Sequence, residues 1–344
     1  MKNVAGNGKS VASIDWTTFT VKMVDNPREV IQTYLKMDDN LFQPQAWGKN
    51  GYRQSMSFCG ITVYFDPPEG RKMEMGVNVQ MSGKGCRTFE RSTGWAVGLK
   101  NGCTPFVPFF AYAHTDLNVN FTRVDLALDD KDKLLDLDTI IDHVESDEIN
   151  SRIKSRTFFK GYDGKHRNGT TVYIGAAASE FRIRFYDKAK ERYTPDDQEY
   201  YYHWVRCEIV MRGKNANGFV AALANTENLG YMASAILRDK LMFIERDNDN
   251  ISRCTVCDWW ENFIGAVASI KLVTKEDVPH TLERSLEWVI TQVAPTLSII
   301  ADAKGFFKVR EILQLGCENR TPQKQAILDD YLKILMVSKN AEEI

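Results

Sequence analysis

Hydrophobic and polar residues alternate along several stretches of the chain, most regularly in FRIRFYDK, residues 181–188. Phe181, Ile183 and Phe185 fall on one side of this stretch, and mostly cationic side chains fall on the other. Successive side chains of a β-strand point to opposite faces of a sheet, so the pattern predicts a half-buried strand. One aromatic residue, Tyr186, lies in the cationic row.

The order of the expected elements repeats once along the chain. The first half reads as a strand at 13–23, a helix at 27–37, strands at 52–66 and 72–82, and a further helix. The second half reads as a strand at 120–130, a helix at 137–146, a hairpin at 171–188, a strand at 202–213, and an Ala-rich helix. This order predicts an α+β fold built from a duplicated, ferredoxin-like antiparallel unit, with two sheets that can join as one. Coincidence is the alternative, because many α+β chains have such an order.

The chain divides into three expected parts. Residues 1–115 form an N-terminal α+β half, residues 116–257 form a second α+β half, and residues 258–344 form a helical C-terminal module. The module shows helical periodicity, and Thr321 followed by Pro322 has the form of a helix start. No low-complexity linker separates the parts.

Composition narrows the class of protein. The chain has 344 residues, of which 43% are hydrophobic, so we expect a substantial core. No apolar run is long enough to span a membrane, and the N-terminus lacks the apolar region of a signal peptide. The seven cysteines are scattered and odd in number, which favours reduced thiols and a cytoplasmic location. Cys254 and Cys257 form a lone CxxC, and we expect buried free thiols there rather than a zinc site.

Charge and histidine spacing exclude other classes. The formal net charge is −2, which argues against a basic DNA-coating protein but allows an enzyme whose positive charge is confined to one groove. The stretch GNGKS at 6–10 lacks the first glycine of a P-loop. The five histidines are not spaced as metal-binding pairs, so a histidine-built metal site is not expected.

Acidic residues among core-like neighbours are the more informative signal. Asp125 and Asp129 share one face of the strand at 120–130, and Arg206 and Glu208 share one face of the strand at 202–213. Carboxylate oxygens are the ligands that Mg²⁺ or Mn²⁺ prefers. Simple salt bridges, of Asp125 with Arg206 or of Glu208 with Arg184, are the alternative.

Seven segments carry a family resemblance: IDWTTFTVK, QMSGKGCR, FTRVDLALDD, TVYIG, FRIRFYDKAKER, HWVRCEIVMRG and WWENFIG. In this order they resemble the replication initiators of Gram-positive rolling-circle plasmids of the Rep_trans type. The related relaxases of integrative conjugative elements look similar. The resemblance covers roughly residues 13–275, whereas the C-terminal module is similar only in being helical.

The resemblance implies a site-specific DNA nickase and strand transferase that initiates and terminates rolling-circle replication at a plasmid-type origin. The family's nucleophilic tyrosine falls on Tyr186. The same motif match makes Asp125 and Glu208, and more weakly Asp129, ligands of Mg²⁺ or Mn²⁺. The implied phosphate contacts are the cations Arg182, Arg184, Lys188 and Arg206.

The implied chemistry gives a reason for a tyrosine among cations. A phenol has a pKa near 10, and flanking cations would lower it and hold the phosphate under attack. Attack leaves a 5′-phosphotyrosine and a free 3′-OH, and the covalent link allows later rejoining. A regulator that binds the origin without chemistry would not need Tyr186, Asp125 and Glu208 together.

The resemblance also implies partners. Termination needs a second attack after the first tyrosine is occupied, which favours a homodimer, with an interface at 288–300 as one option. A host helicase is a further expected partner. The C-terminal module is the expected reader of origin bases, because a helix fits the major groove. A relaxase acting in conjugation shares the chemistry and remains the alternative.

Overall fold

The computed structural model describes residues 11–97, 99, 104–164, 166–226, 228–265 and 289–318, and the single positions 286, 320, 325 and 328. The chain forms two compact units, residues 1–274 and 275–344. The three-part division expected from the sequence is finer than this one and stays a prediction. Among the described residues, no helix is long and apolar enough to cross a membrane.

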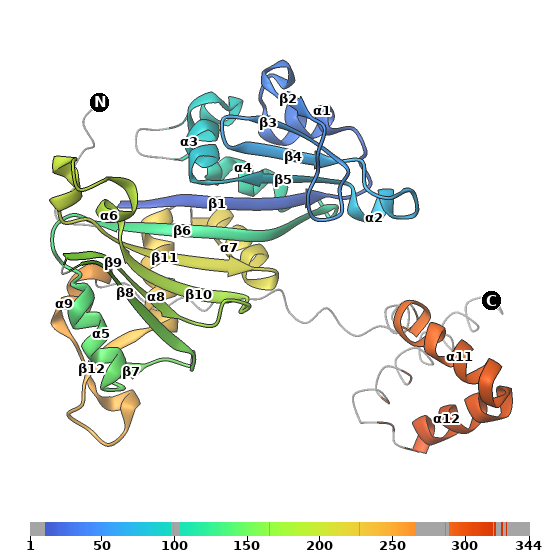
Figure 1. Ribbon diagram of the computed structural model, residues 1–344. Helices are drawn as coiled ribbons and strands as arrows, with labels where there is room; N and C mark the ends of the chain where they lie inside the picture. The colour runs from blue at the N-terminus through green and yellow to red at the C-terminus, as the bar shows by residue number, and fades with distance from the viewer. Residues whose placement is uncertain are drawn as a thin grey trace, which may run out of the picture. The chain divides into compact units, whose positions relative to one another are not determined.

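A ten-stranded antiparallel sheet dominates the first unit (Figure 1). Its strands, in spatial order, are β2 (Gln43–Gln45), β3 (Gln54–Phe58), β4 (Ile61–Phe65), β5 (Val77–Met81), β1 (Val11–Val21), β6 (Val119–Asp130), β11 (Val205–Arg212), β10 (Phe181–Asp187), β9 (His166–Ile174) and β8 (Arg156–Asp163). A small second sheet contains β13 (Thr255–Val256), β12 (Met242–Glu245) and β7 (Ile149–Asn150).

The strand order shows the duplication. In each half the first strand, β1 or β6, pairs with the last strand, β5 or β11, and the other strands follow outward. The two first strands pair with each other, from Val11 opposite Asp129 to Val21 opposite Val119, and so join the halves into one sheet. The expected α+β class with duplicated antiparallel units is confirmed.

Helices cover the sheet and complete the core. Their bounds are α1 (Pro27–Val30), α2 (Lys72–Met75), α3 (Gly83–Ser92), α4 (Phe106–Ala113), α5 (Leu137–Glu145), α6 (Lys188–Arg192), α7 (Lys214–Thr226), α8 (Leu229–Lys240) and α9 (Asp258–Ile264). Short turns of other helix types are η1 (Ile31–Leu35), η2 (Asp39–Leu41), η3 (Glu69–Arg71), η4 (Gly94–Ala96), η5 (Gln198–Tyr201) and η6 (Ile251–Arg253). α7 packs on β6 and β11, and α4 packs on α7.

The period of two along the central strands separates a core face from a polar face. Leu126, Ile183, Phe185 and Ile209 are fully buried in the hydrophobic core. The alternate residues of β6, β10 and β11 point to the other face, so charged side chains of these three neighbouring strands lie next to one another. This polar face carries the candidate site.

The second unit is helical in the part that the structure describes, with η7 (Val289–Val293), α11 (Ala294–Lys304) and α12 (Phe306–Glu318). The helical character expected there is confirmed for these residues. The helix expected to begin at Thr321 falls almost entirely outside the described residues, and so does Trp288, the first residue of the suggested interface. The six described cysteines are free, and Cys254 and Cys257 are buried, as expected.

Candidate active site

Tyr186 lies near the end of β10, on the polar face of the sheet. The register of β10 and β11 sets Tyr186 opposite Arg206 and Arg184 opposite Glu208. The phenol of Tyr186 donates a hydrogen bond to Glu208 Oε2 at 3.2 Å. Arg184 Nη2 donates to the same carboxylate oxygen at 2.7 Å and approaches the phenol oxygen at 3.4 Å. Tyrosine, glutamate and arginine thus form one connected group.

Two cations cover the ring of Tyr186, and the side chain is only 5% exposed. The guanidinium carbon of Arg184 lies 4.4 Å from the ring centroid, and Lys188 Nζ lies 5.5 Å from it. Lys188, the first residue of α6, forms an ion pair with Glu191 at 2.6 Å. The tyrosine therefore lies directly beneath a layer of charged side chains.

Burial decides the ionisation of Tyr186. Removal from water, and then the neighbouring charge of Glu208, raise the pKa of Tyr186 well above its usual value, although Arg184 and Arg206 act in the opposite direction. The expectation that the cationic row lowers this pKa is wrong for the free protein. Each of these two arginines is paired with a carboxylate, and together they do not outweigh burial and Glu208.

Asp125 lies on the same face, on β6. Its carboxylate is 2% exposed and accepts two hydrogen bonds from Arg123, Nε to Oδ1 at 2.8 Å and Nη2 to Oδ2 at 2.5 Å. Burial raises the pKa of Asp125 to about 7; Arg123 opposes the shift, and Glu208 adds to it. Glu208 is therefore close enough to Asp125 for its charge to disfavour the ionised form of Asp125.

Arg206 connects the two halves of the sheet. Its Nε and Nη2 donate to the two oxygens of Asp129 at 2.7 and 2.8 Å, and its Nη1 lies 2.9 Å from Asp15 Oδ1 on β1. Trp204 Nε1 also donates to Asp129, at 2.7 Å. Of the two salt bridges considered as alternatives, Glu208 with Arg184 is confirmed. Asp125 with Arg206 is wrong, because the register sets Arg206 opposite Asp129 instead.

A β-bulge brings two residues of β1 to the site that the sequence analysis missed. Ile14 pairs with Leu126 but Trp16 pairs with Asp125, so Asp15 is an extra residue in β1. Asp15 and Trp16 both line the site as a result. The segment IDW was part of the family resemblance, yet strict alternation would have placed Trp16 with Ile14 on the core face. The bulge could not be seen in the hydrophobic pattern.

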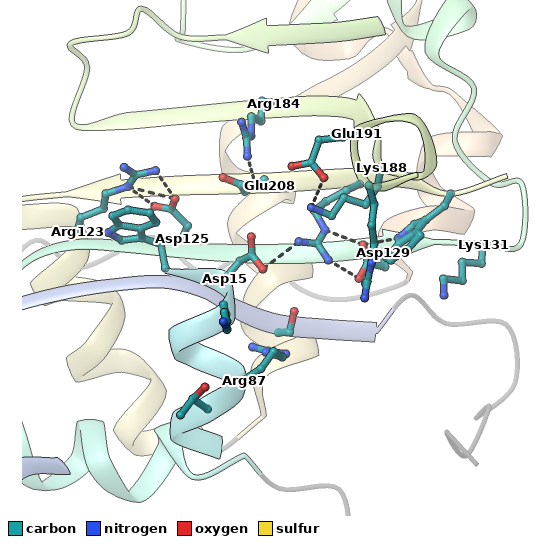
Figure 2. A pocket seen from close by; sticks show the side chains of 18 of the residues that line it. Asp15, Arg87, Arg123, Asp125, Asp129, Lys131, Arg184, Lys188, Glu191 and Glu208 are labelled. Carbon is teal, nitrogen blue, oxygen red and sulfur yellow. Dashed lines mark hydrogen bonds and ion pairs between the residues drawn. The ribbon is translucent and has the colours of Figure 1, made fainter. Parts of the chain in front are cut away.

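These side chains line an open cavity of about 1080 Å³ (Figure 2). Its floor comes from β1, β6, β10 and β11, and its walls include residues of α3 and α6. Nine of the lining residues are lysine or arginine and five are aspartate or glutamate, so the cavity is basic within a chain of net charge −2. A basic groove in a nearly neutral protein suits a polyanion.

The structure brings most of the predicted site residues to this cavity. The lining includes Asp125, Asp129, Arg184, Lys188, Arg206 and Glu208. Tyr186 lies just beneath them. Arg182 does not line the cavity: its Nε donates to the carbonyl of Gly175 at 3.1 Å, and its guanidinium stacks on Tyr173 at 3.8 Å. The phosphate-binding role expected of Arg182 stays a prediction without geometric support.

The three candidate metal ligands do not form a metal site as they are arranged. Asp125, Asp129 and Glu208 each bind a different arginine. Within the described ranges, no group of three or more histidine, cysteine, aspartate or glutamate side chains could hold a metal ion. Carboxylates are suitable donors for Mg²⁺, but a cation here would have to compete with these guanidinium groups. Their metal-binding role stays a prediction.

Comparison with known proteins agrees with this site. Residues 119–315 match the family model of the replication initiation factor, and residues 11–96 match that of the N-terminal domain of rolling-circle replication initiation proteins. The chain belongs to the replication initiation factor family. The matches cover the sheet, the bulge in β1 and the whole of the Tyr186 site. The resemblance drawn from the seven segments is confirmed.

Two relatives extend this result. Over 339 residues, the chain is 26% identical to a protein of Bacillus subtilis (strain 168) that carries the name DNA relaxase NicK, covering 96% of this chain and 92% of the relative. The solved structure of a rolling-circle replication initiator protein from Geobacillus stearothermophilus is 27% identical, with a TM-score of 0.65. That match covers 77% of this chain and 99% of the solved one.

Proposed function

We propose that this replication initiation factor nicks one DNA strand at an origin and later rejoins it, with Tyr186 as the nucleophile. One observation carries the proposal: the Tyr186 phenol is hydrogen-bonded to Glu208, under Arg184, beneath a basic cavity. A nucleophile, an acceptor for its proton and cations for a phosphate are thus within one group. The family membership supports a role in replication initiation.

The reaction needs four changes. The Tyr186 proton passes to the Glu208 carboxylate, and the phenolate oxygen forms a bond to the scissile phosphorus. The bond from phosphorus to the 3′ oxygen breaks, and that oxygen leaves with a proton from solvent as a 3′-OH. A 5′-phosphotyrosine remains, and the 3′-OH reverses the sequence on rejoining. Since the phenol is a weak acid here, proton transfer must accompany attack rather than precede it.

Cations around the cavity supply the electrostatic part. Arg184, Lys188 and Arg206 would hold the phosphate and its developing charge, as their positions at the cavity surface allow. Each is neutralised by a carboxylate in the free protein, and a phosphate would compete for it. Movement of Arg184 and Lys188 toward a phosphate would also uncover the ring of Tyr186.

We also propose that the reaction depends on a bound divalent cation. Asp125 and Glu208 are the carboxylates proposed to bind Mg²⁺ or Mn²⁺, with Asp129 as a weaker third. Such an ion would polarise a phosphate oxygen. Glu208 would then have two roles, metal binding and acceptance of the Tyr186 proton. The two roles predict different nicking rates for a Glu208 variant when metal is added.

The substrate, partners and location are proposed from the same site and family membership. The substrate is an origin in double-stranded DNA that is melted at the nick, with a homodimer as the working unit and a host helicase as a further partner. A cytoplasmic location follows from the DNA on which the protein acts. The second candidate is a relaxase of an integrative conjugative element, which the likeness to NicK favours.

The covalent intermediate provides the test. Wild-type protein incubated with a supercoiled candidate origin and Mg²⁺ or Mn²⁺ should form a protein–DNA adduct that survives a denaturing gel. Tyr186→Phe should form none while it keeps its fold, because the variant loses only the two hydrogen bonds of the phenol, each worth about 1 kcal/mol. The control is Tyr201→Phe, at an exposed tyrosine outside the cavity lining. Adduct formation by Tyr186→Phe would place the nucleophile elsewhere, with Tyr193 and residues 200–202 as the next candidates.

A further inference from the structure

One face of α3, in the N-terminal half, belongs to the cavity. Lys84, Arg87, Thr88 and Arg91 all line it. Their spacing of three, four and seven residues places them on one side of a helix. The opposite side of α3, with Gly85, Cys86 and Phe89, is buried against the rest of the N-terminal half. The proposed chemistry does not use this helix, although its first residues, 83–87, belong to the QMSGKGCR segment.

The basic residues of this face differ in their contacts. Arg87 pairs with Glu90 and donates to the carbonyl of Ile14 on β1, so it ties α3 to the sheet. Lys84 and Arg91 are exposed and make no ion pair with any residue that the structure describes. Two cations without counter-charges therefore stand on one wall of a basic cavity.

A second pair of cations outside α3 also lines the cavity. Lys131 follows β6, and Arg192 ends α6; neither forms an ion pair within the described part of the chain. Both stack on Trp204, at 4.2 and 5.6 Å from its ring centroid. Arg184 of β10 and Arg206 and Glu208 of β11 line the same cavity. Cations of α3, of α6 and of the residue after β6 therefore line the same cavity as the group that surrounds Tyr186.

The position of α3 is fixed tightly. A Cβ at Gly85 would lie 2.2 Å from the carbonyl oxygen of Gly60, in the turn between β3 and β4, so the helix and this turn are in backbone contact. A Cβ at Gly83 would lie 3.1 Å from Asp15, the residue of the bulge that binds Arg206. Close packing on both sides holds α3 at a set position beside the floor of the cavity.

We propose that Lys84 and Arg91 of α3 bind backbone phosphates of the single DNA strand next to the scissile phosphate, and that Lys131 and Arg192 bind further phosphates of the same strand. The inference rests on the proposed function for its substrate. It assigns to the N-terminal half a direct part in holding the strand that the second half cleaves. A single strand is the expected occupant because a paired duplex cannot bring a backbone phosphate down between two walls to a tyrosine beneath the floor.

The test measures binding of a fluorescent single-stranded oligonucleotide as a function of salt. The background is Tyr186→Phe, which prevents covalent capture. In this background Lys84→Gln/Arg91→Gln should weaken binding at least several-fold. It should also reduce the slope of log K against log salt by about 1.4, since each phosphate contact on a single strand contributes roughly 0.7. The matched control, Lys49→Gln/Arg253→Gln, removes the same charge at exposed residues outside the cavity and should leave the slope unchanged.

The outcomes separate the inference from the proposed function. One outcome is an unchanged slope of log K against log salt in the α3 variant, while protein that retains Tyr186 forms the adduct normally. This result would overturn the role of α3 but not the proposed nickase activity. An equal loss of oligonucleotide binding in the α3 variant and in the control would show an effect of overall charge only. This result would also overturn the role of α3. A loss confined to duplex DNA would make α3 a duplex contact, contrary to the inference. A selective loss of single-strand binding without any adduct in the wild type would support α3 and reject the nickase. Lys84 and Arg91 are exposed, so Tm should not move.

Discussion

At the scale of single residues, the protonation of Tyr186 is the feature that most constrains the chemistry. A tyrosine in a row of cations would be expected to ionise easily, yet burial and Glu208 raise its pKa. The arginines that could offset this rise in pKa form ion pairs with carboxylates, Arg184 with Glu208 and Arg206 with Asp129. The free protein therefore holds Tyr186, the proposed nucleophile, protonated. An incoming phosphate would change this balance by drawing the arginines toward itself.

Glu208→Gln distinguishes the two roles of this carboxylate. As the acceptor of the Tyr186 proton, Glu208 should be needed at every metal concentration, and the variant should nick roughly 10²-fold more slowly or worse. As a metal ligand, its loss should be partly offset by more Mg²⁺, because weaker binding is overcome by mass action. Nicking rates of wild type and variant across a Mg²⁺ titration provide the measurement.

Asp125→Asn is the matched comparison for that titration, because Asp125 lies near Glu208 but does not contact the phenol. If Asp125 is a ligand, its variant should need more Mg²⁺ and reach nearly the wild-type rate at saturation. Rates for both variants that equal the wild-type rate at limiting Mg²⁺ would leave the two acids as salt-bridge partners only.

At the scale of elements, the site depends on three packing features: the register of β6 with β11, the bulge in β1 and the close approach of α3. The register sets Arg206 beside Asp129, and the bulge turns Asp15 and Trp16 toward the cavity. The approach of α3 rests on Gly85, because any larger residue would meet the carbonyl of Gly60. Each feature joins segments that are far apart in the sequence.

Gly85→Ala tests the packing of α3. The added Cβ would lie 2.2 Å from a backbone oxygen, so helix and turn must separate. We expect a loss of roughly 1–3 kcal/mol of folding stability, the usual range for overpacking, and a fall in Tm of several degrees. Thermal unfolding followed by circular dichroism measures this. Gly70→Ala is the control, since its Cβ would meet no atom within 4 Å. Equal Tm values for the two variants would show that α3 is less firmly docked than the contact suggests.

At the scale of the whole molecule, every residue proposed for catalysis belongs to the first compact unit. The second unit, residues 275–344, contributes helices of its own. Since a unit with its own core can fold alone, the chemistry and the choice of origin can reside in different parts of the chain.

Deletion of residues 275–344 should therefore leave strand cleavage intact. The shortened protein should still form a covalent adduct with a single-stranded oligonucleotide at nearly the full rate. If the helical module reads bases, the preference for the origin over an unrelated sequence should fall. Adduct yields on the two oligonucleotides, compared with those of the full chain, measure both effects. Retention of the full preference would assign base reading to the first unit.

The proposed homodimer has a functional consequence. A protomer whose Tyr186 carries DNA cannot attack again, so closure of the displaced circle needs a second tyrosine close by. Sedimentation at micromolar concentration should show a dimer. Mixed dimers of wild type and Tyr186→Phe should nick but fail to close the circle. If they release closed circles at the wild-type rate, one tyrosine is sufficient and the two-nucleophile scheme is excluded.

The sequence by itself determined the faces of the strands. The period of two is a local property of the backbone, so it correctly set Asp125 with Asp129, Arg206 with Glu208, and Tyr186 with Arg184 on the polar face. Tertiary structure alone decided which acid binds which arginine, because partners on different strands depend on register. It also decided that Tyr186 is buried and protonated, since its burial and its contact with Glu208 of β11 depend on how the strands assemble. The contributions of Trp16 and α3 arise in the same way, from a bulge and a backbone contact that leave no periodic signal in the chain.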